Sequence, residues 1–539
     1  MLHLNDAALS DRAAWEAAGI SVPAYDRADM IRRTREQPIW LHFGAGNLFR
    51  AFPAAVADRL LCEGVLDRGV IAAEGFDFEI IDRIYAPHDN LSLCVTFLPD
   101  GSVGKRVIGS VAEAVKADES GLPRLTEIFC SPSLKMVSFT ITEKGYSISR
   151  PDGSLLPGIE ADMESGPDGA QTFLAKLTSL LLARFTAGGA PLALVSMDNC
   201  SHNGDKLRTA VLPIAQAWEE RGLATSGFSA YLRDENRISF PISMIDKITP
   251  RPDGTVAEML ASTGFADTET VVTDKHTYIA PFVNAEKPQY LVIEDRFPAG
   301  RVPLDRGGIL FTDRNTVDRV EKMKVCTCLN PLHTALAVFG CLLGKKRISE
   351  EMSDPQLAAL VRTIGYREGL PVVTDPGILD PRRFLDEVVL ERLPNPFMPD
   401  SPQRIATDTS QKMSVRFGET VKAYLKQGLD PSSLVGIPLV CAGWCRYLLG
   451  LDDEGNPLPL SPDPLLPALQ SRLEGISLGS VGEEQAAAAL SPILSNPAIF
   501  GVSLYDAGIG ERVEFLFRRM SEGPGAVRRV LCEAFPSEK

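Results

Sequence analysis

The stretch that decides the fold is Pro38-Ile39-Trp40-Leu41-His42-Phe43-Gly44-Ala45-Gly46-Asn47-Leu48-Phe49-Arg50. Its first six residues form a short apolar run, which predicts a buried strand. Gly44 and Gly46 then fill the first two positions of a G-x-G-x-x-G turn. In such a turn the first glycine permits a tight bend, and the second lets the backbone approach a pyrophosphate at a helix N-terminus. Phe49 stands at the third position, so the motif alone fits an ordinary strand-to-helix turn about as well.

Strand and helix patterns alternate after this turn. Strands are expected at 69–73, 136–140 and 192–196, and amphipathic helices at 52–61 and 172–187. Apolar strands that alternate with helices are typical of a parallel sheet covered on both faces. From about Asp313 onward long helical periods dominate, at 317–343, 354–365, 411–425, 439–449 and 512–519. The sequence therefore predicts an α/β protein: a Rossmann-like domain over 1–315, a mostly α-helical domain over 316–539, and an active site in the cleft between them.

The whole chain excludes several classes of protein. A chain of 539 residues is too long to fold around a single hydrophobic core. Its net charge of −15 opposes non-specific nucleic-acid binding. The N-terminus has no signal-peptide pattern, and the longest apolar stretch, 335–343, is too short to span a membrane. We therefore expect a cytoplasmic protein without nucleic-acid or membrane partners, whose ten cysteines are free thiols. Neither the cysteines nor the six histidines have the spacing of a metal site, so no metal is expected.

The second expected strand ends in Ala73-Glu74-Gly75-Phe76-Asp77. Glu74 or Asp77 could accept hydrogen bonds from the adenosine ribose hydroxyls of a dinucleotide. A carboxylate at that place repels the 2′-phosphate of NADP and so favours NAD. Arg83 follows closely enough to leave NADP open, and either carboxylate could instead be an ordinary solvated loop residue.

Four polar clusters interrupt the apolar pattern. They are Ser196-Met197-Asp198-Asn199-Cys200-Ser201-His202-Asn203-Gly204; Ser243-Met244-Ile245-Asp246-Lys247-Ile248-Thr249-Pro250; residues 321–333 with Lys324, Asn330 and His333; and Arg392-Leu393-Pro394-Asn395-Pro396, followed by Arg404, Asp408 and Lys412. Two further segments accompany them, the glycine turn at Gly44 and the run Thr140-Ile141-Thr142-Glu143-Lys144-Gly145-Tyr146.

In this order the motifs resemble the mannitol dehydrogenase family, the polyol-specific long-chain dehydrogenases that include fructuronate and tagaturonate reductases. The resemblance runs from about Tyr25 to beyond Lys412. It implies a metal-independent, NAD-dependent secondary-alcohol dehydrogenase acting on a polyol or sugar acid, as a monomer or small homo-oligomer. A keto-uronate is the favoured substrate and a neutral ketose the alternative, while a non-catalytic NAD(H)-binding sensor is less favoured.

The resemblance also implies roles for individual residues. Lys324 is the general base, which requires a lysine pKa lowered toward neutrality. Asn199 and Asn330 donate to the substrate oxygen, Glu321 relays protons and Asp246 positions the site. The substrate contacts are His333, Arg404, Lys412 and Asn199. The cofactor-binding residues are Gly44, Gly46, Asn47, Phe49, Arg50, Glu74, Asp77, Thr142 and Glu143.

Each residue taken alone also has a structural explanation. Lys324 could be a surface lysine, His333 a structural histidine and Asn199 the cap of a turn. Asn330-Pro331 could be a helix cap with proline at the first helical position, and Arg404, Asp408 and Lys412 could form an exposed salt-bridged ladder.

The spacing from Lys324 to Asn330 departs from the family pattern. It is six residues, where the family usually has five, and Pro331 removes a helical hydrogen-bond donor. We therefore expect a bulge or kink between Lys324 and Asn330.

Overall fold

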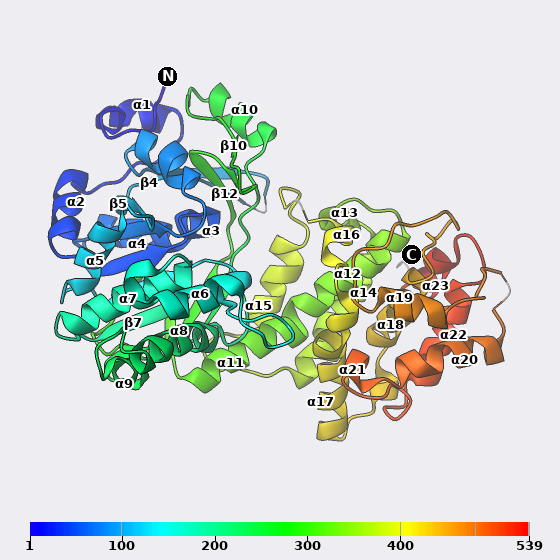
Figure 1. Ribbon diagram of the computed structural model, residues 1–539. Coiled ribbons are helices and arrows are strands. Elements are labelled where there is room, and N and C mark those ends of the chain that lie inside the picture. The colour runs from blue at the N-terminus through cyan, green and yellow to red at the C-terminus, as the bar shows by residue number, and fades with distance from the viewer. Residues whose placement is uncertain (99, 399, 480, 537–539) are drawn as a thin grey trace. The chain divides into compact units, whose positions relative to one another are not determined.

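The computed structural model describes residues 1–98, 100–398, 400–479 and 481–536. The chain forms two compact units, and its colour runs from blue to green along the first and from green to red along the second (Figure 1). Unit 1 contains residues 1–98 and 102–317. Of the described residues, unit 2 contains 100–101, 318–398, 400–479 and 481–536. The division after Val317 falls two residues beyond the boundary expected from the sequence.

Unit 1 is built on a six-stranded sheet. Its strands are β1 (Trp40–Phe43), β2 (Val70–Glu74), β5 (Val111–Lys116), β6 (Met136–Phe139), β7 (Leu192–Ser196) and β8 (Ile238–Ser239). They lie in the order β5-β2-β1-β6-β7-β8, and every pairing is parallel. The chain order reverses between β1 and β6, which is where such sheets bind dinucleotides. The expected Rossmann-like sheet is confirmed.

Helices cover both faces of this sheet because neighbouring strand residues point to opposite sides. Trp40 packs into the core that contains α3 (Asn47–Ala51) and α4 (Pro53–Cys62). Leu41 and Phe43 pack into the core that contains α5 (Leu122–Cys130), α7 (Phe173–Thr186) and α8 (Asn203–Glu220). In Figure 1 α7 and α8 lie together with α9 (Phe228–Arg233).

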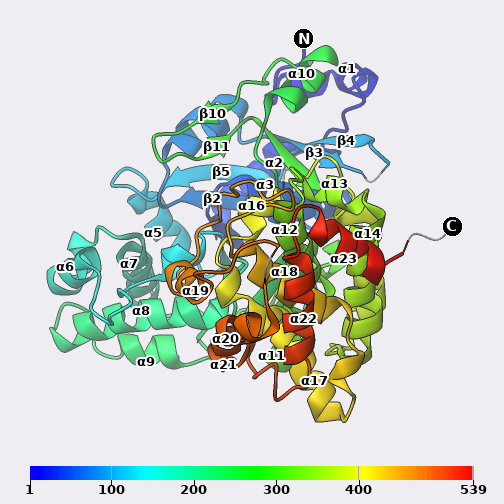
Figure 2. The ribbon, with the colours of Figure 1, turned by 90° about the vertical axis from the view of Figure 1, so that its right-hand side faces the viewer.

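Unit 1 also contains smaller sheets that the sequence pattern did not predict. In one, β3 (Ser92–Phe97) pairs antiparallel with β4 (Val103–Ile108) and parallel with β12 (Phe282–Glu286). In another, β13 (Tyr290–Glu294) pairs antiparallel with β9 (Ser243–Asp246) and parallel with β14 (Leu310–Thr312). A third pairs β10 (Val271–Val272) with β11 (Tyr278–Ile279). Figure 2 shows β10 and β11, and below them β5 beside β2.

Unit 1 has four further α-helices among its described residues. They are α1 (Arg12–Ala17), α2 (Arg27–Glu36), α6 (Pro157–Ser165) and α10 (Gly254–Ser262).

Unit 2 is helical, as expected. Its helices are α11 (Arg314–Met323, which begins in unit 1), α12 (Asn330–Leu342), α13 (Ile348–Met352), α14 (Pro355–Arg362), α15 (Pro381–Glu387), α16 (Pro402–Ile405), α17 (Glu419–Gln427), α18 (Gly436–Tyr447), α19 (Leu466–Arg472), α20 (Glu483–Leu494), α21 (Pro497–Phe500), α22 (Gly510–Met520) and α23 (Ala526–Ala534). π-helices fall within or at the end of three of the long expected helices, at Lys324–Cys328, Thr363–Gly369 and Ser414–Gly418. A further π-helix, Val388–Arg392, follows α15.

One helical run, Arg314–Leu342, is long and apolar enough to cross a membrane by length and composition. Inside the protein, however, 83% of its most apolar window is buried, as in the core helix of a folded domain. Cys326, Cys328 and Cys341 lie on this run, and all ten cysteines of the chain are free thiols.

Candidate active site

The glycine turn joins the carboxyl end of β1 to the two neighbouring strands. The Gly44 N–H donates to the carbonyl of Ala73 (2.9 Å), and the Thr140 N–H donates to the carbonyl of Phe43 (2.8 Å). Gly44 has a φ of +103°, and a Cβ there would lie 2.1 Å from the Thr140 carbonyl oxygen, so only glycine fits. A Cβ on Gly46 would meet no atom within 4 Å. This open space at the start of α3 fits the pyrophosphate of a dinucleotide.

A buried carboxylate fixes the same turn. Glu74 Oε2 accepts from the Ala45 N–H (2.9 Å), while Oε1 accepts from the N–H groups of Phe76 (2.9 Å) and Asp77 (3.2 Å). Burial raises the pKa of Glu74. Asp77 is also buried and accepts from Thr273 Oγ1 (2.6 Å). Glu74 therefore ties the glycine turn to the loop after β2, besides any ribose contact.

The other residues of the motif hold the turn through buried contacts. His42 is fully buried, stacks on Phe49 at 4.1 Å between ring centroids, and has a pKa lowered to about 3 by desolvation. The buried Arg50 guanidinium donates to the Ala280 carbonyl (2.7 Å) and to Asn47 Oδ1 (2.8 Å). Phe49 and Arg50, two expected cofactor contacts, thus have internal partners that hold the turn in shape.

The loop after β6 depends on a second buried carboxylate. Asp198 accepts from the N–H groups of Ile141 (3.0 Å) and Thr142 (2.8 Å) and from the Tyr146 hydroxyl (2.5 Å). These bonds hold Thr142 at a φ of +65°, which is unusual for a residue with a Cβ. Glu143 pairs with Lys206 (2.6 Å). This loop therefore has a fixed shape beside the glycine turn.

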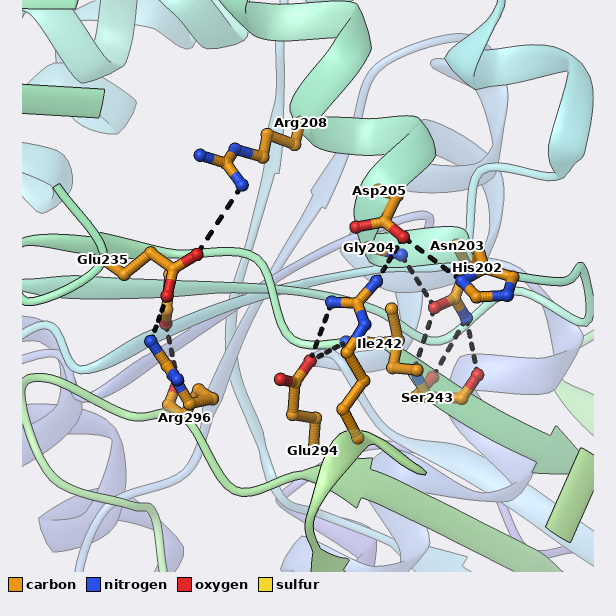
Figure 3. Close-up of polar contacts among 12 residues, drawn as sticks. His202, Asn203, Gly204, Asp205, Arg208, Glu235, Ile242, Ser243, Glu294 and Arg296 are labelled. Atoms are coloured by element: carbon orange, nitrogen blue, oxygen red, sulfur yellow. Dashed lines mark hydrogen bonds and ion pairs between the residues drawn. The ribbon is translucent and has the colours of Figure 1, made fainter. Parts of the chain in front are cut away.

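The loop that carries Asn199 is tied to strand β9 (Figure 3). Fully buried Asn203 donates to the Ser243 carbonyl (3.0 Å), and its Oδ1 accepts from the Ser243 N–H (2.9 Å). Asn203 also donates to the carbonyl of Asp198 (2.9 Å). Asn199 lies exposed in that loop, and buried Asp246 ends β9. In the sequence, only the place of Asn203 within a polar cluster indicates this role.

In unit 2, Lys324 begins a π-helix that ends at Cys328. α12 then starts at Asn330, with Pro331 as its second residue. The expected bulge between Lys324 and Asn330 is confirmed, because a π turn contains one more residue than an α turn.

Two alternatives from the sequence are wrong at this place. Lys324 is not a surface lysine, since it is 3% exposed. Asn330 is not a helix cap, since it lies inside the first turn and Leu329 occupies the cap position. Glu321 lies three residues before Lys324 in α11 and is partly exposed.

His333 lies in a cluster of charged groups within unit 2. Its Nε2 is 3.5 Å from Asp400 Oδ2, and Asp400 Oδ1 also pairs with Arg404. Burial lowers the pKa of His333 to about 4; Asp400 opposes the shift, while Arg416, Arg404 and Arg392 add to it. His333 is therefore neutral at pH 7 and able both to donate and to accept hydrogen bonds.

The proposed ladder of Arg404, Asp408 and Lys412 does not form. Helix α16 ends at Ile405, and Asp408 has a left-handed φ of +54°, so these residues do not share one helical face. Lys412 Nζ instead donates to the backbone carbonyl of Thr407. Desolvation, together with Arg416, lowers the pKa of Lys412.

Asp400 and Arg416 belong to this cluster without any spacing in the sequence that relates them to His333. Asp400 lies outside the helices, and Arg416 lies on the π-helix Ser414–Gly418. Among the residues that the structure describes, no group of three or more His, Cys, Asp or Glu side chains could hold a metal ion.

A parallel sheet with a glycine turn at its switch point, followed by a helical unit with a buried lysine, defines a dinucleotide-dependent dehydrogenase. Residues 38–306 match the mannitol dehydrogenase Rossmann domain, and residues 316–506 match the mannitol dehydrogenase C-terminal domain. The chain belongs to the mannitol dehydrogenase family. The expected family and oxidoreductase class are confirmed.

Individual relatives agree with this assignment. The chain is 52% identical to the D-mannonate oxidoreductase of Thermotoga maritima, across 100% of both chains. It is 29% identical to the mannitol 2-dehydrogenase of Cereibacter sphaeroides, over 84% of this chain and 88% of the relative.

Solved structures show the same fold. A substrate-free D-sorbitol dehydrogenase superposes with a TM-score of 0.78 at 24% identity, covering 96% of this chain and 98% of that one. The Pseudomonas fluorescens mannitol 2-dehydrogenase, solved as a ternary complex with NAD and D-mannitol, gives a TM-score of 0.68 at 25% identity, covering 96% and 97%.

Proposed function

We propose that this protein is an NAD-dependent D-mannonate oxidoreductase, which interconverts D-mannonate and the keto-uronate fructuronate. The observation that carries the proposal is the 52% identity to a D-mannonate oxidoreductase along the whole length of both chains. The cationic surroundings of His333 agree with it, since the chain as a whole has a net charge of −15 and an anionic substrate needs a locally positive site.

The residues of unit 1 fit NAD. The positive φ of Gly44 and the open space at Gly46 provide the turn at which the pyrophosphate binds. Glu74 at the end of β2 and Asp77 in the following loop disfavour the 2′-phosphate of NADP, because carboxylates there repel it. Asn47, Thr142 and Glu143 complete the proposed cofactor contacts. When bound, NAD accepts or supplies the hydride.

The protein's own groups handle the proton and the substrate oxygen. The proposal assigns proton transfer to Lys324 Nζ, which burial places away from water. The side-chain amides of Asn199 and Asn330 donate to the substrate oxygen and stabilise its alkoxide character. Neutral His333 binds substrate hydroxyls, with Arg404 and Lys412 as further contacts.

Supporting roles fall to two carboxylates. Glu321, one helical turn before Lys324, relays the proton, and Asp246 at the end of β9 positions the site. We further propose a cytoplasmic protein that acts as a monomer or small homo-oligomer, with ten free thiols in agreement.

The test follows absorbance at 340 nm with D-mannonate and NAD, and separately with D-mannitol and NAD. Turnover of D-mannonate is expected. Turnover of D-mannitol alone would favour a mannitol 2-dehydrogenase, and NADH binding without turnover of either compound would favour a sensor.

Two variants test the catalytic residues. Asn199→Ala should lower turnover by about 10²- to 10³-fold, since one oxyanion donor contributes that much. Lys324→Ala should lower it by about 10²- to 10⁴-fold, the usual contribution of a general base. NADH should still bind to both variants. Exposed Lys322, which pairs with Glu419 (3.2 Å), provides the matched control Lys322→Ala. Near wild-type turnover in both variants would contradict the assignment.

A further inference from the structure

Arg416 is a desolvated arginine of unit 2 whose charge is not paired with a carboxylate among the residues that the structure describes. It lies on the π-helix Ser414–Gly418, and its guanidinium donates to the Thr334 hydroxyl. Thr334 is fully buried and in turn donates to the Asn330 carbonyl (3.0 Å). Arg416 is therefore fixed beside the first turn of α12, which carries the proposed catalytic Asn330 and the substrate contact His333.

Three observations support the position of Arg416 next to this turn. It is bonded to the residue that follows His333 in the chain, and it is the strongest of the three arginines that disfavour protonation of His333. The π-helix that carries it also packs against the π-helix that begins at Lys324. Arg416 thus borders the proposed substrate contacts of unit 2.

The charge of Arg416 has no counter-ion among the residues that the structure describes. Its hydrogen bond to Thr334 uses one of five guanidinium donors, and the acceptor is a neutral hydroxyl. By contrast, Arg404 is already paired with Asp400, the carboxylate that faces His333. Desolvation lowers the pKa of Arg416 to about 10, so it still carries its charge at neutral pH.

We propose that Arg416 binds the carboxylate of a sugar-acid substrate and so makes the enzyme prefer aldonates and keto-uronates to neutral polyols and ketoses. The inference rests on the proposed function and adds the residue that selects the substrate class. A planar guanidinium suits this role because it can form two parallel hydrogen bonds to one carboxylate. A hydroxymethyl group in the same place would leave the positive charge unpaired.

D-mannonate and D-mannitol provide a matched pair of substrates. They differ in one terminal group, a carboxylate against a hydroxymethyl, and share the remaining hydroxyl configuration. Arg416→Gln keeps hydrogen-bonding capacity toward Thr334 but removes the charge. We expect its kcat/KM for D-mannonate to fall by about 10- to 100-fold, mainly through KM, as expected for a lost hydrogen bond to a charged group. Its kcat/KM for D-mannitol should stay within about threefold.

Controls separate a selective role from a structural one. Arg472→Gln removes an exposed positive charge elsewhere in unit 2 and should change neither substrate's kinetics. Arg416→Lys, which keeps the charge without the planar fork, should retain part of the preference for D-mannonate. In thermal-shift measurements D-mannonate should stabilise the wild type more than Arg416→Gln.

The outcomes distinguish this inference from the proposed function. Wild-type protein that does not oxidise D-mannonate would overturn the proposed function and the inference with it. Wild-type turnover combined with equal losses on both substrates in Arg416→Gln would leave the function standing and overturn the inference, as would an unchanged KM for D-mannonate.

Discussion

Replacing Glu74 by glutamine tests whether that carboxylate holds the dinucleotide turn or serves only as a ribose ligand. The carboxylate accepts three backbone N–H groups, one on Oε2 and two on Oε1. Glutamine can keep its carbonyl oxygen toward Phe76 and Asp77, but its NH₂ then faces the Ala45 N–H, donor against donor. The loss of one charge-assisted hydrogen bond and the weakening of the other two should lower the free energy of unfolding by about 3 kcal/mol.

The assay combines thermal unfolding without cofactor and NADH binding measured by fluorescence. At about 2 °C per kcal/mol for a unit of this size, Glu74→Gln should lower the unfolding temperature of unit 1 by about 6 °C. NADH affinity should fall at the same time because the turn is no longer fixed. Glu258→Gln changes an exposed glutamate of the same unit and serves as the control. An unchanged unfolding temperature with weaker NADH binding would refute the role of Glu74 in holding the turn. It would leave only a role as a ribose ligand.

Two further predictions concern the glycine turn and His333. Gly44→Ala should lose both stability and NADH binding, because its Cβ would lie 2.1 Å from the Thr140 oxygen; Gly46→Ala should keep its unfolding temperature and lose NADH affinity, because its Cβ would occupy only open space. Equal unfolding temperatures for the two variants would contradict this. The folded pKa of His333 is about 4, below the unfolded value, so the unfolded chain binds more protons and wild-type stability falls as the pH drops from about 6.5 to 4. His333→Gln should reduce that loss by up to about 3 kcal/mol, measured from urea unfolding at pH 7 and pH 4.5; identical losses in both proteins would argue against a neutral buried histidine.

The central sheet could be predicted because its strands are continuous apolar runs that end in turns. The expected strand at 192–196 matches β7 residue for residue, and β1 and β6 were displaced by only one or two residues at their ends. The pairing of β3 with β12 could not be predicted, since Phe97 and Glu286 are far apart in sequence and nothing local indicates which strands meet. Non-local pairing of this kind depends on the packed core.

The residues of the candidate site that are close in sequence could also be predicted, whereas those brought together by folding could not. Lys324, Asn330 and His333 lie in one short segment, and the irregular spacing there was enough to predict a distorted helix. Asp400 and Arg416 reach His333 from separate loops and helices, and no periodic pattern marks them. The sequence indicates that Glu74 is an acidic residue at the end of a strand. Its three backbone partners lie on two different loops, so its role in holding the glycine turn could not be predicted.

The π-helix at Lys324–Cys328 has a consequence for how such chains are compared. Each residue added to an α-helix turns everything after it by about 100° around the axis, so a single insertion would normally swing a downstream side chain to another side. The wider π turn at Lys324–Cys328 takes up one extra residue before α12 begins at Asn330. A search pattern with a rigid five-residue interval between the lysine and the asparagine would therefore overlook this chain, in which the interval is six.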